Sequence, residues 1–310
     1  MPTPLAVALF LGSLALTLAA AGFFADRLDH VGPRLGLPEA VVGLLTALAA
    51  DAPELSSAIV ALTRGEKDVS LGVVLGSNVF NLAAMVGLSA VLAGAVTIGR
   101  RELAVEGSVA LAATFVAGAL VLGLLPAAWA CALFAAVAIP YVVAAARQPA
   151  LHHRLPHVHE GALWKPLALI VPAIALIVLG STGMVRSALV LSDRWHVSKI
   201  VVGIVVLAVL TSLPNAYTAV RLGLTGRGSA LVSEAFGSNT INLVGGILVP
   251  SLVVGLAGHS GLTEANLAWL VAMTCVVVIL LAPRRGMTRL GGALLVCLYA
   301  AFVAVQLAYA

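Results

Sequence analysis

Charged residues are scarce in this chain. Asp, Glu, Lys and Arg make up 10% of its 310 residues, against about 25% in an average soluble domain. Aromatic residues are also few, at 5%, whereas apolar residues reach 61% and the mean hydropathy is +1.11. Too little charge remains to cover a water-exposed surface. The composition excludes a soluble globular domain and a disordered chain, and it favours a protein that lies almost wholly in a lipid bilayer.

Cysteine is nearly absent as well. Cys131, Cys275 and Cys297 each lie within an apolar run, without the spacing of a disulfide framework or a metal site. We interpret them as small buried apolar residues. The first apolar run, residues 5–24, has no basic segment before it. Its length suits a spanning helix rather than a cleaved signal.

The sequence consists largely of long apolar runs. A helix needs about 20 mainly apolar residues to cross the hydrocarbon core. The runs do not alternate as the strands of a membrane barrel do, and a helix satisfies its own backbone hydrogen bonds. The sequence therefore predicts an all-α polytopic membrane protein. Its ten expected helices are residues 4–25, 38–63, 69–97, 103–124, 127–146, 164–187, 198–222, 229–257, 264–283 and 289–309.

The basic residues indicate how these helices are oriented. If the N-terminus lies outside, the loops after odd-numbered helices face the cytoplasm and hold twelve of the seventeen Lys and Arg residues. Cytoplasmic loops of membrane proteins carry such an excess. We therefore expect a multi-pass protein of the cell (inner) membrane with both termini outside. The net charge of +4 then belongs to these loops and does not indicate nucleic-acid binding.

One polar stretch divides the chain. Residues 147–163 separate a first five-helix half, residues 1–146, from a second, residues 164–310. We interpret the stretch as a solvated cytoplasmic linker that is rich in histidine. A metal-sensing loop is the alternative, although the histidines lack a defined metal spacing. They are His152, His153, His157 and His159.

The two halves share motifs at a constant spacing. APE at 52–54 corresponds to LPN at 213–215, and GSNVFN at 76–81 corresponds to GSNTIN at 237–242. Both pairs of motifs are offset by 161 positions. Because five helices form each half, the second half enters the membrane from the opposite side. The sequence thus predicts two inverted five-helix repeats, an architecture of many secondary transporters.

Polar side chains occur where a bilayer makes them costly. Asp51 and Glu54 lie in the middle of an expected span, and acids there are functional candidates by default. Pro53 and Pro214 each remove a backbone donor and free a carbonyl, which predicts a broken helix at each. Carbonyl, hydroxyl and carboxylate oxygens suit hard cations such as Ca²⁺ and Na⁺. Near Pro214 the side-chain oxygens come from Thr211, Ser212 and Asn215.

The Gly-Ser-Asn motifs extend this cluster. Residues i and i+4 share a helix face, so Ser77 lies with Asn81, and Ser238 lies with Asn242. Glu234 is one turn before Ser238 and either extends the face or lies at the membrane interface. Close helix packing through small residues is the alternative function of these motifs. The predicted cation-binding residues are Asp51, Glu54, Ser77, Asn81, Thr211, Ser212, Asn215, Ser238 and Asn242, with Glu234 as a further candidate.

In these motifs the sequence resembles the calcium/cation antiporter superfamily, the sodium/calcium exchangers, over nearly the whole chain. The resemblance implies ten helices in inverted repeats, with cation sites between helices two, three, seven and eight. It implies alternating access, in which Ca²⁺ moves one way and Na⁺ or H⁺ the other, without a further cofactor. It also implies Glu54 as the first-repeat ligand, with further oxygens from Ser77, Asn81, Thr211, Ser212, Ser238 and Asn242.

The chain departs from the family pattern at its acids. Asn215 stands where the second repeat usually has Glu, and Asn242 replaces an acid found in many sodium-coupled members. Asp51 follows Ala50 where the family usually has Thr-Ser. We therefore expect Asp51, or else Glu234, to supply the second negative charge beside Glu54. Two close carboxylates repel each other when empty, and H⁺, Na⁺ or Ca²⁺ each relieves that repulsion.

The leading prediction is thus a secondary antiporter of Ca²⁺ that is not an enzyme. Another divalent cation such as Mg²⁺ or Mn²⁺, and a cation channel, are the alternatives. An intramembrane aspartyl hydrolase at Asp51 would need a second mid-span Asp, which the sequence lacks. The expected partners are inorganic cations and the lipid bilayer. The choice between Na⁺ and H⁺ stays open, as does the oligomeric state, with a monomer as one option.

Overall fold

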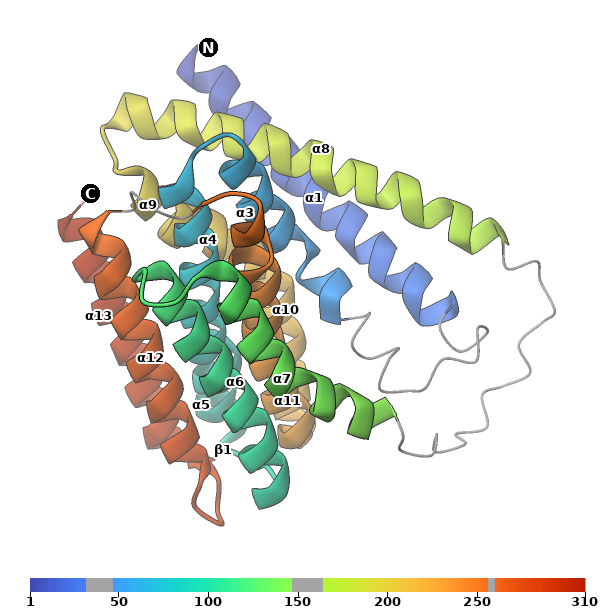
Figure 1. Ribbon diagram of the computed structural model, residues 1–310, viewed down its shortest axis with the longest axis vertical. Helices are drawn as coiled ribbons and strands as arrows, with labels where there is room; N and C mark the ends of the chain where they lie inside the picture. Colours follow the sequence, from blue (N-terminus) through green and yellow to red (C-terminus); the bar gives the residue numbers. More distant parts are fainter. Residues whose placement is uncertain (32–46, 147–163, 256–259, 310) are drawn as a thin grey trace.

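The computed structural model describes residues 1–31, 47–146, 164–255 and 260–309 (Figure 1). The described residues are almost entirely helical. The linker 147–163 with its four histidines lies outside them, and so do residues 38–46 of the expected helix 38–63. The α-helices are α1 (Thr3–Val31), α3 (Ala52–Thr63), α4 (Lys67–Phe80), α5 (Ser89–Ala93), α6 (Arg100–Val121), α7 (Ala127–Ala146), α8 (Trp164–Trp195), α9 (Lys199–Val201), α10 (Ala208–Leu224), α11 (Gly228–Leu243), α12 (Gly261–Leu281) and α13 (Arg289–Ala308).

Shorter elements connect or extend these helices. Three π-helical segments continue α4, α9 and α11, and a two-residue strand pair joins the α5–α6 connection to the α12–α13 connection. In the antiparallel pair, Ala95 lies opposite Thr288 and Val96 opposite Met287. The segments are η2 (Asn81–Leu88), η3 (Val202–Leu207), η4 (Val244–Leu248), the 3₁₀ turn η5 (Pro250–Leu252), and strands β1 (Ala95–Val96) and β2 (Met287–Thr288).

Helix α4 occupies the centre of the molecule. Every residue from 69 to 80 is buried, and the helix contacts α3, α10, α12 and η3. Its closest crossing is with η3, where Gly72 faces Gly203. A Cβ atom on Gly72 would lie 2.7 Å from the Ile200 carbonyl oxygen, and one on Gly203 would lie 2.7 Å from that of Val69. Small residues permit this approach, and it brings the two halves of the chain together at the core.

Helices α1 and α8 form a separate long pair. Figure 1 shows them side by side, running diagonally to the other helices. Helix α8 has 32 residues, or about 48 Å, which exceeds the roughly 30 Å of hydrocarbon and calls for a tilt. Gly180 and Gly183 of α8 face Thr17 and Ser13 of α1, and a Cβ atom on either glycine would clash. The pair is therefore held by close packing of small residues.

Apolar side chains cover the outside, and polar side chains gather inside. Val171, Leu179 and Leu290 are 70%, 61% and 84% exposed, whereas Asp51 and Glu54 are each 1% exposed. This arrangement suits a lipid solvent. Among the described residues, seven helical spans are long and apolar enough to cross a membrane, and α3, α7 and α11 are not among them. The expectation of an all-helical membrane protein thus agrees with the structure, while the count of ten is not established by this criterion.

The two prolines have different local effects. Residues 47–50 are helical, Asp51 forms a turn, and α3 then begins at Ala52, so the helix is interrupted before Pro53. Helix α10, by contrast, runs unbroken with Pro214 inside it. The expectation of a break at Pro214 is therefore wrong. Its ring lies on the exposed side of α10, where the loss of one backbone hydrogen bond can be tolerated in a packed membrane helix.

Candidate cation site

The two mid-span acids lie at the start of α3. Asp51 is the residue that precedes the helix, and Glu54 lies in its first turn. The interruption of the helix exposes backbone N–H groups at this point, and the positive end of the helix dipole favours negative charge. Both side chains are 1% exposed, and their negative charges repel each other. The break thus places two carboxylates together in the protein interior.

Helix α10 supplies one hydrogen-bond donor to each acid. The Ser212 hydroxyl donates to Glu54 Oε1 at 2.8 Å, and the Asn215 amide Nδ2 donates to Asp51 Oδ1 at 2.8 Å. These two contacts are equivalent under the repeat, because Asp51 corresponds to Ser212 and Glu54 to Asn215 at the offset of 161. The two hydrogen bonds are equivalent in position, but both carboxylates come from the first half of the chain. The second half contributes neutral donors.

The Gly-Ser-Asn motifs complete the network from α4, η2 and α11. The Ser238 hydroxyl donates to Asp51 Oδ1 at 2.7 Å, and Asn81 Nδ2 donates to Ser238 Oγ at 2.9 Å. Asn242 Nδ2 donates to Ser77 Oγ at 3.4 Å, which is the equivalent contact in the other half. All five side chains are at most 3% exposed. The structure therefore brings these predicted site residues into one buried cluster.

Two further residues of the motifs, Asn78 and Asn239, were not singled out from the sequence. Asn78 Nδ2 donates to the Asn239 carbonyl at 3.1 Å, and Asn239 Nδ2 donates to the Asn78 carbonyl at 3.1 Å. The residues are 161 positions apart. Asn78 lies next to Ser77 in sequence and therefore on a different face of α4 from Ser77 and Asn81, which are one turn apart. The shared offset was the signal that could have identified this reciprocal pair.

Several oxygens of the cluster have no hydrogen-bond donor among the described residues. In each acid, one carboxylate oxygen accepts the hydrogen bonds described above, and the other accepts none. The amide oxygens of three asparagines are also buried and unpaired, because their NH₂ groups make the contacts. An unpaired buried oxygen is costly unless it meets a donor or a cation. The oxygens are Asp51 Oδ2, Glu54 Oε2, Asn78 Oδ1, Asn81 Oδ1 and Asn242 Oδ1.

Two predicted site residues lie apart from this network. Thr211 is buried, but its hydroxyl donates to the Leu207 carbonyl of its own helix at 2.9 Å. Glu234 is half-buried on α11, but it accepts no hydrogen bond from the described residues. Neither side chain touches the two acids through a hydrogen bond. Their part in a cation site stays a prediction.

The electrostatics of the cluster favour a cation. Asp51 and Glu54 form no ion pair within the part of the chain that the structure describes, and the donors around them are neutral. The same part contains no group of three or more His, Cys, Asp or Glu side chains. A transition-metal site of nitrogen and sulfur ligands is thus not indicated there. Carboxylate and amide oxygens are the ligands of hard cations such as Ca²⁺.

Comparison with known proteins identifies the family. The profile of the sodium/calcium exchanger protein family matches residues 5–146 and 165–308. The chain belongs to the sodium/calcium exchanger protein family. This family is one of transporters, so the exchanger family resemblance seen in the motifs is confirmed. The motifs, the apolar helices and the family together identify a multi-pass membrane protein of the cation exchanger type.

The chain is also similar to individual proteins and solved structures. Inner membrane protein YrbG of Escherichia coli (strain K12) is 28% identical over 269 residues, which are 80% of each chain. The structure of native YfkE has a TM-score of 0.71 at 18% identity, covering 98% of this chain and 96% of its own. The sodium-calcium exchanger NCX_Mj, soaked with Na⁺, has a TM-score of 0.66 at 19% identity, with coverages of 98% and 99%. These two structures show that the fold is shared.

Proposed function

We propose that this protein is a secondary active antiporter that exchanges Ca²⁺ for Na⁺ or H⁺ by alternating access. The observation that carries the proposal is the buried cluster in which Asp51 and Glu54 each keep one unpaired oxygen beside three unpaired amide oxygens. Ca²⁺ takes about six to eight oxygen ligands, in flexible geometry. Two carboxylates balance its charge, and neutral oxygens complete the set. No enzymatic activity and no cofactor besides the transported cations are expected.

The same cluster gives a physical basis for exchange. Without a cation, two carboxylates would repel each other in a medium of low dielectric. One Ca²⁺, two Na⁺ or two H⁺ would each remove that repulsion. A carrier whose empty site is unfavourable moves between its two faces mainly when loaded. Antiport follows, because each ion can leave only when another takes its place.

The membrane architecture belongs to the proposal too. We infer ten helices in two inverted five-helix repeats, residues 1–146 and 164–310, joined by a cytoplasmic linker at 147–163. The reciprocal Asn78–Asn239 bonds and the equivalent contacts of Ser212 and Asn215 support a two-fold relation between the halves. The loop charges support an N-terminus and a C-terminus outside the cell membrane. Labelling of a cysteine added at each terminus of intact cells would test this orientation.

The decisive experiment is transport in liposomes. The full chain is reconstituted, and uptake of ⁴⁵Ca²⁺ is followed with an outward Na⁺ gradient and then with an outward H⁺ gradient. We expect uptake with at least one gradient and its loss in Glu54→Gln. The matched control is Glu102→Gln, which makes the same chemical change at an exposed position in the first turn of α6 and should leave uptake intact.

The outcomes separate the parts of the proposal. Uptake with one gradient names the driving ion. Uptake that persists in Glu54→Gln would contradict the proposed site while leaving antiport standing. If Ca²⁺ enters under neither gradient, Ca²⁺ is not the substrate, and the same liposomes are then tested with Mg²⁺ and Mn²⁺. Single-channel currents in a planar bilayer would instead contradict the carrier mechanism.

A further inference from the structure

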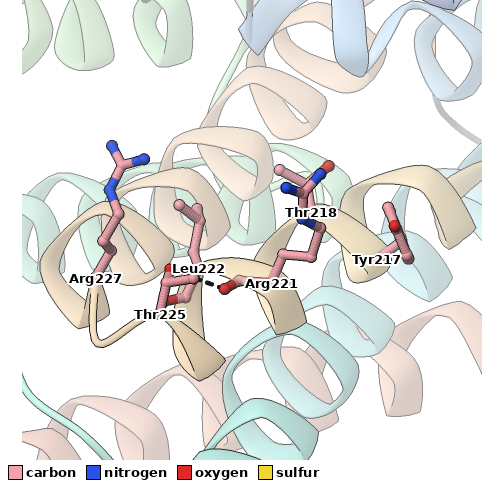
Figure 2. A pocket seen from close by; sticks show the side chains of 6 residues that line it. All are labelled: Tyr217, Thr218, Arg221, Leu222, Thr225 and Arg227. Carbon is pink, nitrogen blue, oxygen red and sulfur yellow. Dashed lines mark hydrogen bonds between the residues drawn. The ribbon is translucent and has the colours of Figure 1, made fainter.

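A recess lies on the outer side of α10, away from the cation cluster. It has a volume of about 380 Å³ and is lined by the last turns of α10 and the turn into α11 (Figure 2). Arg221 and Arg227 line it, and Figure 2 shows their guanidinium groups on the same side. The other lining residues are Tyr217, Thr218, Leu222 and Thr225.

The two arginines are available to an anion. Both are exposed, and within the described ranges neither guanidinium forms an ion pair or a side-chain hydrogen bond. The hydroxyls of Thr218 and Thr225 already donate to carbonyls of their own helix, at 3.1 Å and 2.9 Å. The remaining side-chain donors of the recess are the two guanidinium groups and the Tyr217 hydroxyl. Guanidinium groups bind phosphate through paired, geometrically matched hydrogen bonds.

The surroundings of the recess resemble a membrane interface. Leu213 and Tyr217 are 48% and 67% exposed and lie on the outer side of α10 toward the membrane interior, whereas Leu224, 60% exposed, ends the helix. The turn after α10 packs beside the β1 strand, since a Cβ atom on Gly228 would meet the backbone of Thr97. Arg100 and Arg101 begin α6 just after that strand. Basic residues thus gather at the end where we place the cytoplasm, and this leaflet carries the anionic lipids.

We propose that this recess binds an anionic phospholipid, with its phosphate on Arg221 and Arg227 and an acyl chain along Leu213 and Tyr217. A free phosphate would satisfy the arginines but would leave the exposed apolar side chains unused. A lipid satisfies both. The opposite side of α10 carries Ser212 and Asn215, so a lipid bound here would stabilise the helix that holds the two acids. Any effect on exchange rests on the proposed antiport, whereas lipid binding does not.

The test measures lipid retention on the purified full chain. Phosphatidylglycerol, phosphatidylcholine and inorganic phosphate are titrated onto the delipidated protein, and bound molecules are counted by native mass spectrometry. We expect Arg221→Gln/Arg227→Gln to bind phosphatidylglycerol about 25-fold more weakly, since each arginine near an anionic surface contributes about fivefold. Binding of phosphatidylcholine should be weak in all variants. The matched control is Arg284→Gln/Arg285→Gln, which removes the same charge from the exposed α12–α13 turn at the same end.

Each alternative result has a definite meaning. Equal retention in the recess variant and the wild type would overturn the site. Equal weakening in the control variant would mean general attraction to a basic surface, which also overturns it. Displacement of phosphatidylglycerol by equimolar inorganic phosphate would assign the recess to a free anion instead. If the double variant does not fold, Arg227→Gln alone, in the exposed turn, should show about a fivefold loss.

Discussion

Asp51 and Glu54 are three positions apart, yet their surroundings differ. Asp51 Oδ1 accepts hydrogen bonds from Asn215 and Ser238, whereas Glu54 Oε1 accepts one from Ser212. One oxygen of each acid is thus fixed by neutral donors, and the other is unpaired within the described part of the chain. Fixing one oxygen orients the second. This division lets a carboxylate hold its position while its free oxygen faces a cation.

The Asp51–Asn215 pair allows a charge-exchange test. Asp51→Asn removes one of the two negative charges, and one unbalanced charge in the membrane interior costs about 2.5–3.5 kcal/mol. We expect about a 100-fold loss of apparent Ca²⁺ affinity in the liposome assay. Asn215→Asp alone should also impair transport, because it replaces the 2.8 Å hydrogen bond by a contact between like charges.

The double variant Asp51→Asn/Asn215→Asp keeps one acid and one amide at these positions. Because Asn215 lies within hydrogen-bond distance of Asp51, the hydrogen bond can re-form with its donor and acceptor exchanged. We expect recovery to within about tenfold of the wild-type affinity, given the cost stated for one unbalanced charge. If the double variant is as impaired as the two single variants, the position of the negative charge matters more than its presence. Asp51 and Asn215 are then not interchangeable.

The reciprocal amide contacts of Asn78 and Asn239 are expected to stabilise the protein. Asn78→Ala or Asn239→Ala removes the side-chain donor to a buried carbonyl and should cost about 1 kcal/mol of stability. Melting in detergent would measure the loss. Ser108→Ala serves as the control, since this exposed hydroxyl bonds only to the Val105 carbonyl of its own helix. A normal melting temperature in both asparagine variants would contradict this role.

At the scale of the elements, the two halves use their prolines differently. In the first half the chain turns at Asp51 before α3 begins, which exposes a helix N-terminus beside the acids. In the second half α10 continues through Pro214, and its contributions to the cluster are neutral. The helix is interrupted in the half that carries the two carboxylates. A helix N-terminus stabilises negative charge there, whereas it would contribute little to a neutral serine or asparagine.

The π-helical segments mark the same region. Segment η2 begins at Asn81, and η4 begins two residues after Asn242. Residues 83–87 of η2 correspond to 244–248 of η4 at the offset of 161. Such segments are rare and concentrate at functional sites. A π-helical segment is found at Asn81 in the first half and just after Asn242 in the second. The helix of each half is therefore wider directly after the cluster.

The crossing of α4 and η3 should not tolerate a larger side chain. Gly72→Ala places a methyl group 2.7 Å from the Ile200 carbonyl oxygen, and overpacking of this kind costs about 1–3 kcal/mol. We expect a lower melting temperature in detergent. The control is Gly12→Ala in α1, where a Cβ atom meets nothing within 4 Å. An unchanged melting temperature in Gly72→Ala would mean that the two halves can separate slightly at no cost.

At the scale of the whole molecule, the two fully buried acids of the cluster contrast with the exposed charges, most of which lie near the ends of the described helices. Large apolar side chains face outward, and the two acids are almost fully buried. The lipid therefore meets mainly apolar side chains, and the buried cluster offers a set of oxygens with two formal charges. Glu234 lies half-buried at the edge of this set. The charge count of the cluster then limits the stoichiometry of exchange.

We predict that exchange moves no net charge. Two carboxylates balance one Ca²⁺ in one direction and two monovalent cations in the other. Uptake of ⁴⁵Ca²⁺ should keep the same rate when a K⁺ gradient with valinomycin sets the membrane potential to positive or negative values. Glu234→Gln should leave this behaviour unchanged. A rate that depends on the potential in the wild type, and not in Glu234→Gln, would mean that Glu234 carries a third charge.

Much of the helical layout could be predicted from the sequence, because an apolar run of bilayer length has few options besides a helix. The expected helix 127–146 agrees with α7, and the expected 289–309 with α13. The break at Pro214 was wrong, because the sequence does not tell which side of a helix faces lipid. Asn78 was overlooked, because its partner lies 161 positions away and contacts of that range leave no local pattern.

The sequence by itself determined the membrane class, the exchanger family and the two motif-bearing halves. These follow from composition and from local repeats, which need no coordinates. Only the tertiary structure decided which polar atoms pair and which oxygens remain unpaired. Ser212 reaches Glu54 and Asn215 reaches Asp51 across 158 and 164 positions. Such contacts depend on how helices cross and rotate against each other, and helix periodicity leaves that choice to the packing of the whole molecule.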